Sequence, residues 1–347
     1  MHLVWQDSCF IQLACQLNSR CGATCFNGES RVSIGSVVEK LRINEVAPRD
    51  GLQSQPRQVS CDDKLRLISA LVDAGVAAIE ATSFVSPKAV PQMADASELF
   101  PRLPDPQRIR YSALVPNERG LERAHQAGVR EFAVVLSATE TMNRRNINMG
   151  LPEATNVCAS TLAAGIGTGM TGKAYVAVAF ACPFEGLVAE DRVIDLTERM
   201  FAAGAVEVVI ADTIGAAAPR AVGKLLHHAV RRFGAERLSL HLHDTRGFAL
   251  ANAWAAMEEG IRGFDTSVGG LGGCPFAPGA AGNLATEDLV LMAEQCGFAT
   301  GIDIAKLRLA MAVATSITGA SLGGRTAQWL CAEDARRLKN VEQKAGD

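Results

Sequence analysis

A short run rich in β-branched and aromatic residues, followed by a stretch with helical periodicity, recurs eight times along most of this 347-residue chain. Several helical stretches end in glycine, and glycine also precedes the next run in segments such as DAGVAAIE and AAGAVEVVI. Such alternation predicts parallel strands joined by helical crossovers. The runs predicted as strands are 41–48, 77–84, 108–115, 131–138, 173–180, 206–213, 237–244 and 263–270.

Eight strand–helix units in about 250 residues match the size of a closed barrel. The alternative, an open doubly wound sheet, calls for a glycine-rich turn after the first strand, and RDGLQSQP is not such a turn. The segment GIGTGM at 165–170 precedes a strand instead of following one, so we interpret it as a plain connection. The prediction is therefore an α/β protein, a (β/α)8 TIM barrel spanning 39–347 and including C-terminal helices.

Residues 1–38 do not share the repeat, and we expect a poorly ordered N-terminal extension there. The segment holds cysteines at 9, 15, 21 and 25, in a spacing that fits no common zinc finger, and it lacks the basic flank of a secretory signal. We expect a cytoplasmic protein. The alternative is a mitochondrial or other organellar location, if Arg20 and Arg31 belong to a presequence.

The composition narrows the range of partners. A net charge of -3 predicts neither a nucleic-acid partner nor an anionic membrane surface, and no run of about 18 apolar residues indicates a membrane span. The ten cysteines show no C-x-x-C spacing and are too sparse for a disulfide scaffold, which favours reduced thiols. A small-molecule substrate is the remaining expectation.

Polar residues gather where the predicted strands end, which is where barrel enzymes carry their chemistry. His241 and His243 are two residues apart, so both point to one face of their strand. Closure of the barrel would bring Asp50 and Asn283 to the same place. Two imidazoles, one carboxylate and one amide oxygen suit a divalent ion such as Mg2+ or Mn2+. A structural zinc site completed by Cys274 is the alternative.

The segment GLGGCPFAPGAAGN, residues 270–283, is too rich in glycine for a strand or a helix interior. We expect a loop over the barrel mouth, in which the thiol of Cys274 is placed for proton transfer or nucleophilic attack. The alternative is that Cys274 is a small buried apolar residue.

Seven motifs over residues 41–330 resemble those of the 3-hydroxy-3-methylglutaryl-CoA lyase family. The members of this family are metal-dependent barrel enzymes that break carbon–carbon bonds. The motifs are EVAPRDGLQ, IEATSFVSPKAVPQMAD, NRRNIN, CPFEG, DTIG, HLHDTRGFALAN and GLGGCPFAPGAAGNLATEDLV.

The resemblance implies a retro-Claisen lyase that releases acetyl-CoA and acetoacetate, a step of leucine breakdown. It assigns the metal to Asp50, His241, His243 and Asn283. It places Arg49 on the thioester carbonyl and Cys274 as proton donor, with Asp50 or His241 as the catalytic base. It also implies supporting or substrate-binding roles for further residues, which are Gln53, Glu80, Asp212 and Thr213.

Some positions depart from the family pattern, including Ala89, Met142 and the C-terminal segment GASLGGRTAQ. These departures leave open a lyase for a related tertiary 3-hydroxyacyl-CoA, such as citramalyl-CoA. A condensing synthase of the same superfamily is the second alternative, although such synthases typically carry a glycine-glutamate-arginine segment in place of the cysteine loop. An acyl-CoA is the expected substrate in each case, and a homodimer is a possible assembly.

Overall fold

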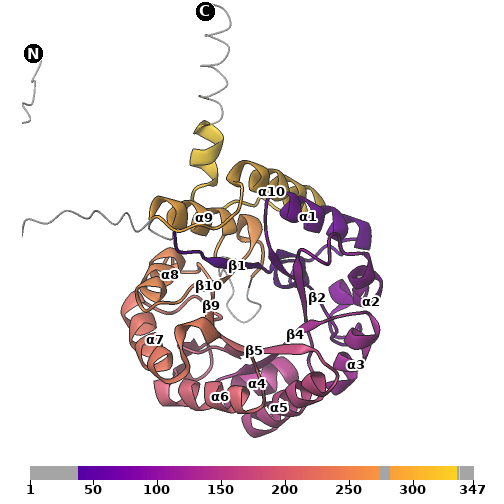
Figure 1. Cartoon of the computed structure of the whole chain (residues 1–347), viewed down its shortest axis with the longest axis vertical. Coiled ribbons are helices and arrows are strands. Elements are labelled where there is room, and N and C mark those ends of the chain that lie inside the picture. The colour runs from indigo at the N-terminus through magenta and orange to yellow at the C-terminus, as the bar shows by residue number, and fades with distance from the viewer. Residues whose placement is uncertain (1–37, 274–281, 334–335, 337–347) are drawn as a thin grey trace, which may run out of the picture. The chain divides into compact units, whose positions relative to one another are not determined.

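The computed structural model describes residues 38–273, 282–333 and 336, and it contains a closed barrel of eight parallel strands (Figure 1). The order around the barrel is β1-β10-β9-β8-β5-β4-β3-β2, so each strand lies beside its neighbours along the repeat and β10 closes onto β1. The predicted (β/α)8 barrel is confirmed. Its strands are β1 Arg42–Glu45, β2 Ala78–Ser83, β3 Arg110–Leu114, β4 Glu131–Ser137, β5 Thr171–Ala177, β8 Glu207–Asp212, β9 Leu238–Leu242 and β10 Gly263–Thr266.

The observed strands fall on all eight predicted runs, and most are shorter because pairing stops where the chain turns into the loops of the barrel mouth. The fifth strand instead begins two residues early, at Thr171, directly after the turn that the sequence contains as GIGTGM. A small antiparallel hairpin that the sequence analysis did not anticipate follows it, formed by β6 Ala181–Cys182 and β7 Gly186–Leu187.

Helices surround the strands on the outside of the barrel (Figure 1). Their starts follow ordinary capping chemistry, since Ser60 accepts from the amide of Asp63 and Asn117 accepts from the amide of Gly120. The helices are α1 Cys61–Asp73, α2 Ala96–Leu99, α3 Glu118–Gln126, α4 Glu140–Ile147, α5 Leu151–Gly167, α6 Glu190–Ala202, α7 Pro219–Phe233, α8 Ala249–Glu258, α9 Thr286–Gln295 and α10 Ile304–Thr318.

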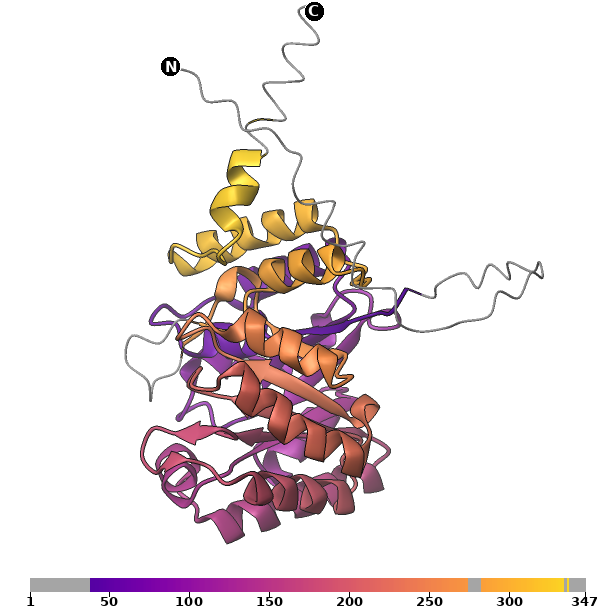
Figure 2. The same ribbon diagram turned by 90° about the vertical axis from the view of Figure 1, so that its left-hand side faces the viewer.

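The C-terminal helices expected from the sequence are present. α10 starts at the cap residue Asp303 and ends at Gly319, which has the left-handed conformation. It packs against α1 and α9 (Figure 2). A further helical segment covers 327–333. The predicted extension 1–38 lies, except for Val38, outside the described residues. Among those residues, no helix is long and apolar enough to cross a membrane.

The inside of the barrel holds a compact apolar layer of Leu114, Ala133, Tyr175 and Val209, contributed by the adjacent strands β3, β4, β5 and β8. The larger core lies between the strands and the surrounding helices. This inner layer lies beneath the polar residues at the carboxyl ends of the strands.

A buried carboxyl group, Glu45, holds the end of β1 to the segment before α9. Its oxygens accept hydrogen bonds from the amides of Ala47 and Val268, at 2.9 and 3.0 Å, and from the hydroxyl of Thr286 at 2.7 Å. Burial raises the pKa of Glu45 to about 7 despite these hydrogen bonds, and the nearby Glu287 raises it further. The folded protein therefore retains a proton that the unfolded chain releases above pH 4.5.

Glu45→Gln should be more stable relative to the wild type at pH 8 than at pH 5. The stabilisation that Glu45 contributes is complete below its unfolded pKa and is lost as the pH rises through about 7, whereas glutamine does not titrate. The difference in the free energy of unfolding should shift in favour of the variant by up to about 3 kcal/mol between these pH values. Urea unfolding at both pH values measures it. The exposed Glu258→Gln is the control, and a Glu45→Gln difference that is the same at both pH values contradicts the assignment.

Candidate active site

A tight turn after β1 brings two charged side chains into the barrel mouth. The turn is the π-helix η1, Ala47–Gly51, in which the carbonyl of Val46 accepts from the amides of Arg49, Asp50 and Gly51 at 3.1, 2.8 and 3.2 Å. This convergence leaves Arg49 and Asp50 at the carboxyl end of β1, with the Arg49 side chain buried and the Asp50 side chain 21% exposed.

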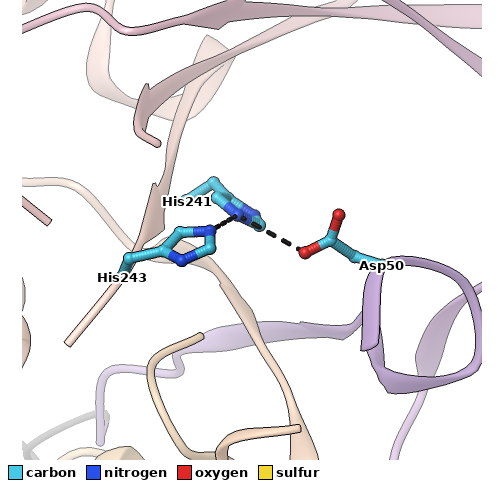
Figure 3. Close-up of side chains that lie close together, drawn as sticks. All are labelled: Asp50, His241 and His243. Carbon is cyan, nitrogen blue, oxygen red and sulfur yellow. Dashed lines mark hydrogen bonds and ion pairs between the residues drawn. The ribbon is translucent and has the colours of Figure 1, made fainter. Parts of the chain in front are cut away.

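The two histidines predicted to face the same side of their strand do so. His241 lies in β9 and His243 directly after it, and both are buried. Their Nε2 atoms are 3.2 Å apart, and Oδ2 of Asp50 lies 4.0 Å from Nε2 of His241 (Figure 3). One ligand atom from each of Asp50, His241 and His243 lies within 4.8 Å of the other two, so the three side chains can share one metal ion.

Asn283 joins this cluster, as the sequence analysis predicted. Its Nδ2 donates to Oδ2 of Asp50 at 2.9 Å and to the carbonyl of Leu271 at 3.1 Å, which fixes the orientation of the amide. Its Oδ1 is buried and makes no hydrogen bond within the described part of the chain. A buried amide oxygen without a donor beside one carboxylate and two imidazoles suits a divalent cation, and the donor set therefore fits a metal ion.

Glycine lets the two ends of the 270–283 loop approach the site. A Cβ added to Gly272, where φ is +133°, would meet Nδ2 of Asn283 at 2.5 Å, and one added to Gly282 would meet the carbonyl oxygen of Gly270 at 1.8 Å. Larger residues at these positions would displace Asn283 from Asp50. Cys274 itself lies outside the described residues.

The charges of the site shift the pKa values of its groups in a consistent direction. Burial alone would raise the pKa of Asp50, but Arg49 and the two histidines outweigh it and hold this pKa well below its usual range. Burial would lower the pKa of His241, but the hydrogen bond to Asp265 and the charge of Asp50 raise it above its ordinary value. The site is therefore arranged for an ionised carboxylate beside positive charge.

Arg49 is held by two carboxylates. Its Nε donates to Oε1 of Glu80, which is fully buried in β2, and its Nη1 donates to Oδ1 of Asp50 at 2.6 Å. The remaining guanidinium nitrogen, Nη2, makes no hydrogen bond to any described residue. Glu80 thus fixes the plane of the guanidinium while the two N–H groups of Nη2 stay available to a bound molecule.

Other predicted site residues have different partners in the structure. Asp212, at the end of β8, accepts from the amides of Ala216 and Ala217 at 2.9 and 3.0 Å, and burial raises its pKa. Thr213 Oγ1 accepts from the amide of Val178 at 2.8 Å. Asp212 and Thr213 therefore shape loops at the barrel mouth.

Gln53 is the remaining predicted residue, and it lies one turn after Asp50. Its Oε1 is buried and, among the described residues, has no hydrogen-bond partner. No hydrogen bond joins its side chain to the metal-ligand cluster in the described part of the chain.

Sequence reasoning missed three residues that lie behind the cluster: Asn44, Tyr175 and Asp265. Asp265 and Tyr175 are buried, and the Tyr175 hydroxyl is 2.7 Å from Oδ2 of Asp265 and 3.3 Å from Oε2 of Glu80. The available signal was an acidic residue in the middle of an otherwise uncharged strand run, GFDTSVGG.

The chain is a closed (β/α)8 barrel, and a carboxylate, two histidines and an asparagine meet at the carboxyl ends of its strands. This combination is typical of metal-binding barrel enzymes. The profile of the HMGL-like family matches residues 40–318. The chain belongs to this family.

Relatives with assigned names agree with the family. The chain is 44% identical over 269 residues to a hydroxymethylglutaryl-CoA lyase of Bacillus subtilis, covering 78% of this chain and 90% of the relative. It is 39% identical to the mitochondrial hydroxymethylglutaryl-CoA lyase of Homo sapiens, covering 82% and 88%. A solved HMG-CoA lyase of Acinetobacter baumannii, in complex with coenzyme A and 3-methylmalate, aligns with a TM-score of 0.81 and 39% identity, covering 84% and 96%.

His241→Ala should weaken metal binding at least ~100-fold, because loss of even an outer partner of a ligand typically costs about 10–100-fold. Isothermal titration calorimetry of the metal-free protein with Mn2+ measures the affinity. His228→Ala, which removes an exposed histidine of α7, is the matched control and should bind as the wild type does. An unchanged affinity in His241→Ala would remove this residue from the ligand set.

Proposed function

We propose that this protein is a divalent-metal-dependent lyase that cleaves 3-hydroxy-3-methylglutaryl-CoA to acetyl-CoA and acetoacetate. The observation that carries the proposal is the cluster of Asp50, His241, His243 and Asn283 beside Arg49, in a member of this family. The named relatives, one of them solved with coenzyme A, support an acyl-CoA as the substrate.

The reaction places three demands on the site. The C3 hydroxyl loses its proton, the C2–C3 bond breaks so that its electron pair forms the enolate of the thioester, and C2 of this enolate then takes up a proton. Asp50, His241, His243 and Asn283 would hold the metal ion, which supplies Lewis acidity toward the hydroxyl and orients it. Asp50 would accept the proton, because Nδ1 of His241 lies 3.1 Å from the Asp265 carboxylate and Nε2 of His241 would bind the ion.

Arg49 would stabilise the enolate. Its charge cannot be lost at working pH, and the pairing with Glu80 and Asp50 holds the guanidinium in place before substrate arrives. Nη2 would then donate to the thioester oxygen, where negative charge develops. Gln53, Asp212 and Thr213 would shape the pocket around the acyl chain.

Cys274 would donate the final proton. A thiol on a glycine-rich loop can close over the substrate, and its ordinary pKa of about 8.5 suits proton transfer to a carbanion equivalent. The asparagine at the far end of the same loop would be a metal ligand, so that loop position and metal binding are coupled.

A panel of acyl-CoA thioesters tests the reaction. The purified protein loaded with Mg2+ should release acetyl-CoA from 3-hydroxy-3-methylglutaryl-CoA with a higher kcat/KM than from citramalyl-CoA or longer branched homologues. A reversed order would assign the protein to a related lyase, for which the departures at Ala89 and Met142 would be responsible. Product formation from acetyl-CoA and a keto acid without any cleavage activity would indicate a synthase.

Arg49→Lys should lose about 3–4 kcal/mol of transition-state stabilisation, because an ammonium cannot reproduce the planar fork that binds Glu80, Asp50 and the enolate together. Steady-state kinetics should show the loss mainly in kcat. Arg199→Lys, on the exposed face of α6, is the control and should be nearly as active as the wild type. Near-normal turnover in Arg49→Lys would leave Arg49 with a structural role alone.

Cys274→Ser should lower kcat about 100- to 10,000-fold with little change in KM, because a hydroxyl is nearly isosteric but a far weaker acid. Bound substrate should protect the wild-type thiol from alkylation. Cys182→Ser is the control, since Cys182 is buried in β6 and accepts from the hydroxyl of Thr139 at 3.1 Å. An inactive Cys182→Ser together with an active Cys274→Ser would show that the proton donor is not on the glycine-rich loop.

The proposal includes three further expectations. The mixed nitrogen and oxygen donor set favours Mg2+ or Mn2+ over zinc. A cytoplasmic location is expected, with mitochondria as the alternative that the presence of mitochondrial relatives supports. A homodimer is a possible assembly.

A further inference from the structure

Asp265 and Asn44 lie in one layer of the barrel with the metal-ligand candidate His241. Asp265 of β10 is paired in register with His241 of β9 on one side and with Asn44 of β1 on the other. These neighbouring strands therefore place His241, Asp265 and Asn44 side by side. Asp265 is 3% exposed, so its carboxylate is satisfied by protein groups and not by bulk water.

The carboxylate of Asp265 receives hydrogen bonds on both oxygens. Oδ1 accepts from Nδ2 of Asn44 at 2.8 Å, while Oδ2 accepts from the hydroxyl of Tyr175 at 2.7 Å and lies 3.1 Å from Nδ1 of His241. An ionised carboxylate can only accept, so the hydrogen between Asp265 and His241 belongs to Nδ1 of the imidazole. In the neutral ring, Nε2 then carries the lone pair.

That lone pair faces the metal-ligand cluster. Nε2 of His241 lies 3.2 Å from Nε2 of His243 and 4.0 Å from Oδ2 of Asp50, on the opposite side of the ring from Asp265. If the proton were on Nε2 instead, His241 would present a hydrogen where a cation must bind. The tautomer of His241 is therefore decisive for the site.

We propose that Asp265 is the positioning residue of the metal site, which fixes both the plane of His241 and the tautomer that presents Nε2 to the ion. The inference rests on the proposed metal site and goes beyond it by naming the group that prepares the ligand. A carboxylate behind a ligating histidine also raises the basicity of the imidazole, and loss of such a partner typically costs about 10–100-fold in metal affinity.

Tyr175 extends this arrangement to the other half of the site. Its hydroxyl has one hydrogen, which the 2.7 Å distance assigns to Asp265, while Oε2 of Glu80 lies 3.3 Å from the same oxygen. Glu80 in turn binds Arg49. These contacts make the buried groups beside His241 and beside Arg49 neighbours, and Asp265 is the one among them that contacts His241.

The direct test reads the tautomer in the wild-type protein. Protein labelled with 15N-histidine, with the metal removed by chelation, is examined by two-bond 1H–15N correlation, and the His241 signals are assigned by their absence in His241→Ala. The spectrum of neutral His241 should show a protonated Nδ1 and an unprotonated Nε2. A neutral ring protonated at Nε2 would overturn the proposal.

Asp265→Asn provides the second arm, because it keeps the shape of the side chain and removes the charge. Mn2+ affinity of the metal-free protein should fall about 10–100-fold, and His241 should become a mixture of tautomers. Asn44→Ala removes a donor from the other carboxylate oxygen and should weaken binding less than Asp265→Asn does. Equal losses in both variants, with the His241 tautomer unchanged, would reduce Asp265 to a packing role.

A matched pair on the surface controls for the chemistry of the substitution. Glu259, at the end of α8, lies 3.2 Å from Nδ1 of the exposed His227 and makes no ion pair or hydrogen bond to the cluster residues within the described part of the chain, so Glu259→Gln should leave Mn2+ affinity unchanged. Failure of the wild type to bind Mn2+ would refute the proposed metal site. Tight binding by the wild type and equally tight binding by Asp265→Asn would refute this inference alone.

Discussion

Pairing of β1 with β10 closes the barrel, and the composition of the candidate site depends on this closure. The ladder runs from Arg42 opposite Gly263 to Glu45 opposite Thr266, and the amide of Val46 continues it to the carbonyl of Thr266 at 2.8 Å. It sets the first strand of the chain beside the last one, β10, whose other neighbour is β9. Asp50 and His241, 191 positions apart in the sequence (241 − 50), meet only for this reason.

Charge compensation explains why the ionisable groups of the mouth occur together. Arg49, Glu80, His241 and Asp265 are almost fully buried, and each has an oppositely charged or hydrogen-bonding partner within this set or in Asp50. A buried charge without its partner is costly, so the members of such a network stabilise one another and exchange of one alone lowers stability. The same network fixes the directions of the donors that a substrate would meet, which is the preorganisation that catalysis of this kind requires.

The carboxyl group of Glu45 extends this principle to the fold around the site. It ties the end of β1 to Val268 and Thr286, while Glu287 of α9 accepts from the amides of Gly269 and Gly324. Buried carboxyl groups thus hold both ends of the segment that contains the glycine-rich loop. The residues that would bind metal and enolate stand on strand ends with fixed geometry, whereas the proposed proton donor belongs to the loop between these anchors.

The sequence alone determined the eight-unit repeat, because strand and helix periodicities and the glycines between them are local properties of the chain. It also determined that His241 and His243 share a face, which follows from the two-residue period of a strand. Strand limits, the hairpin at 181–187 and the partners of Asp212 and Thr213 were not accessible, since they depend on where pairing stops and loops pack. Only the tertiary structure decided that Asp265 lies behind His241, because the register of neighbouring strands sets that contact and no local pattern records it.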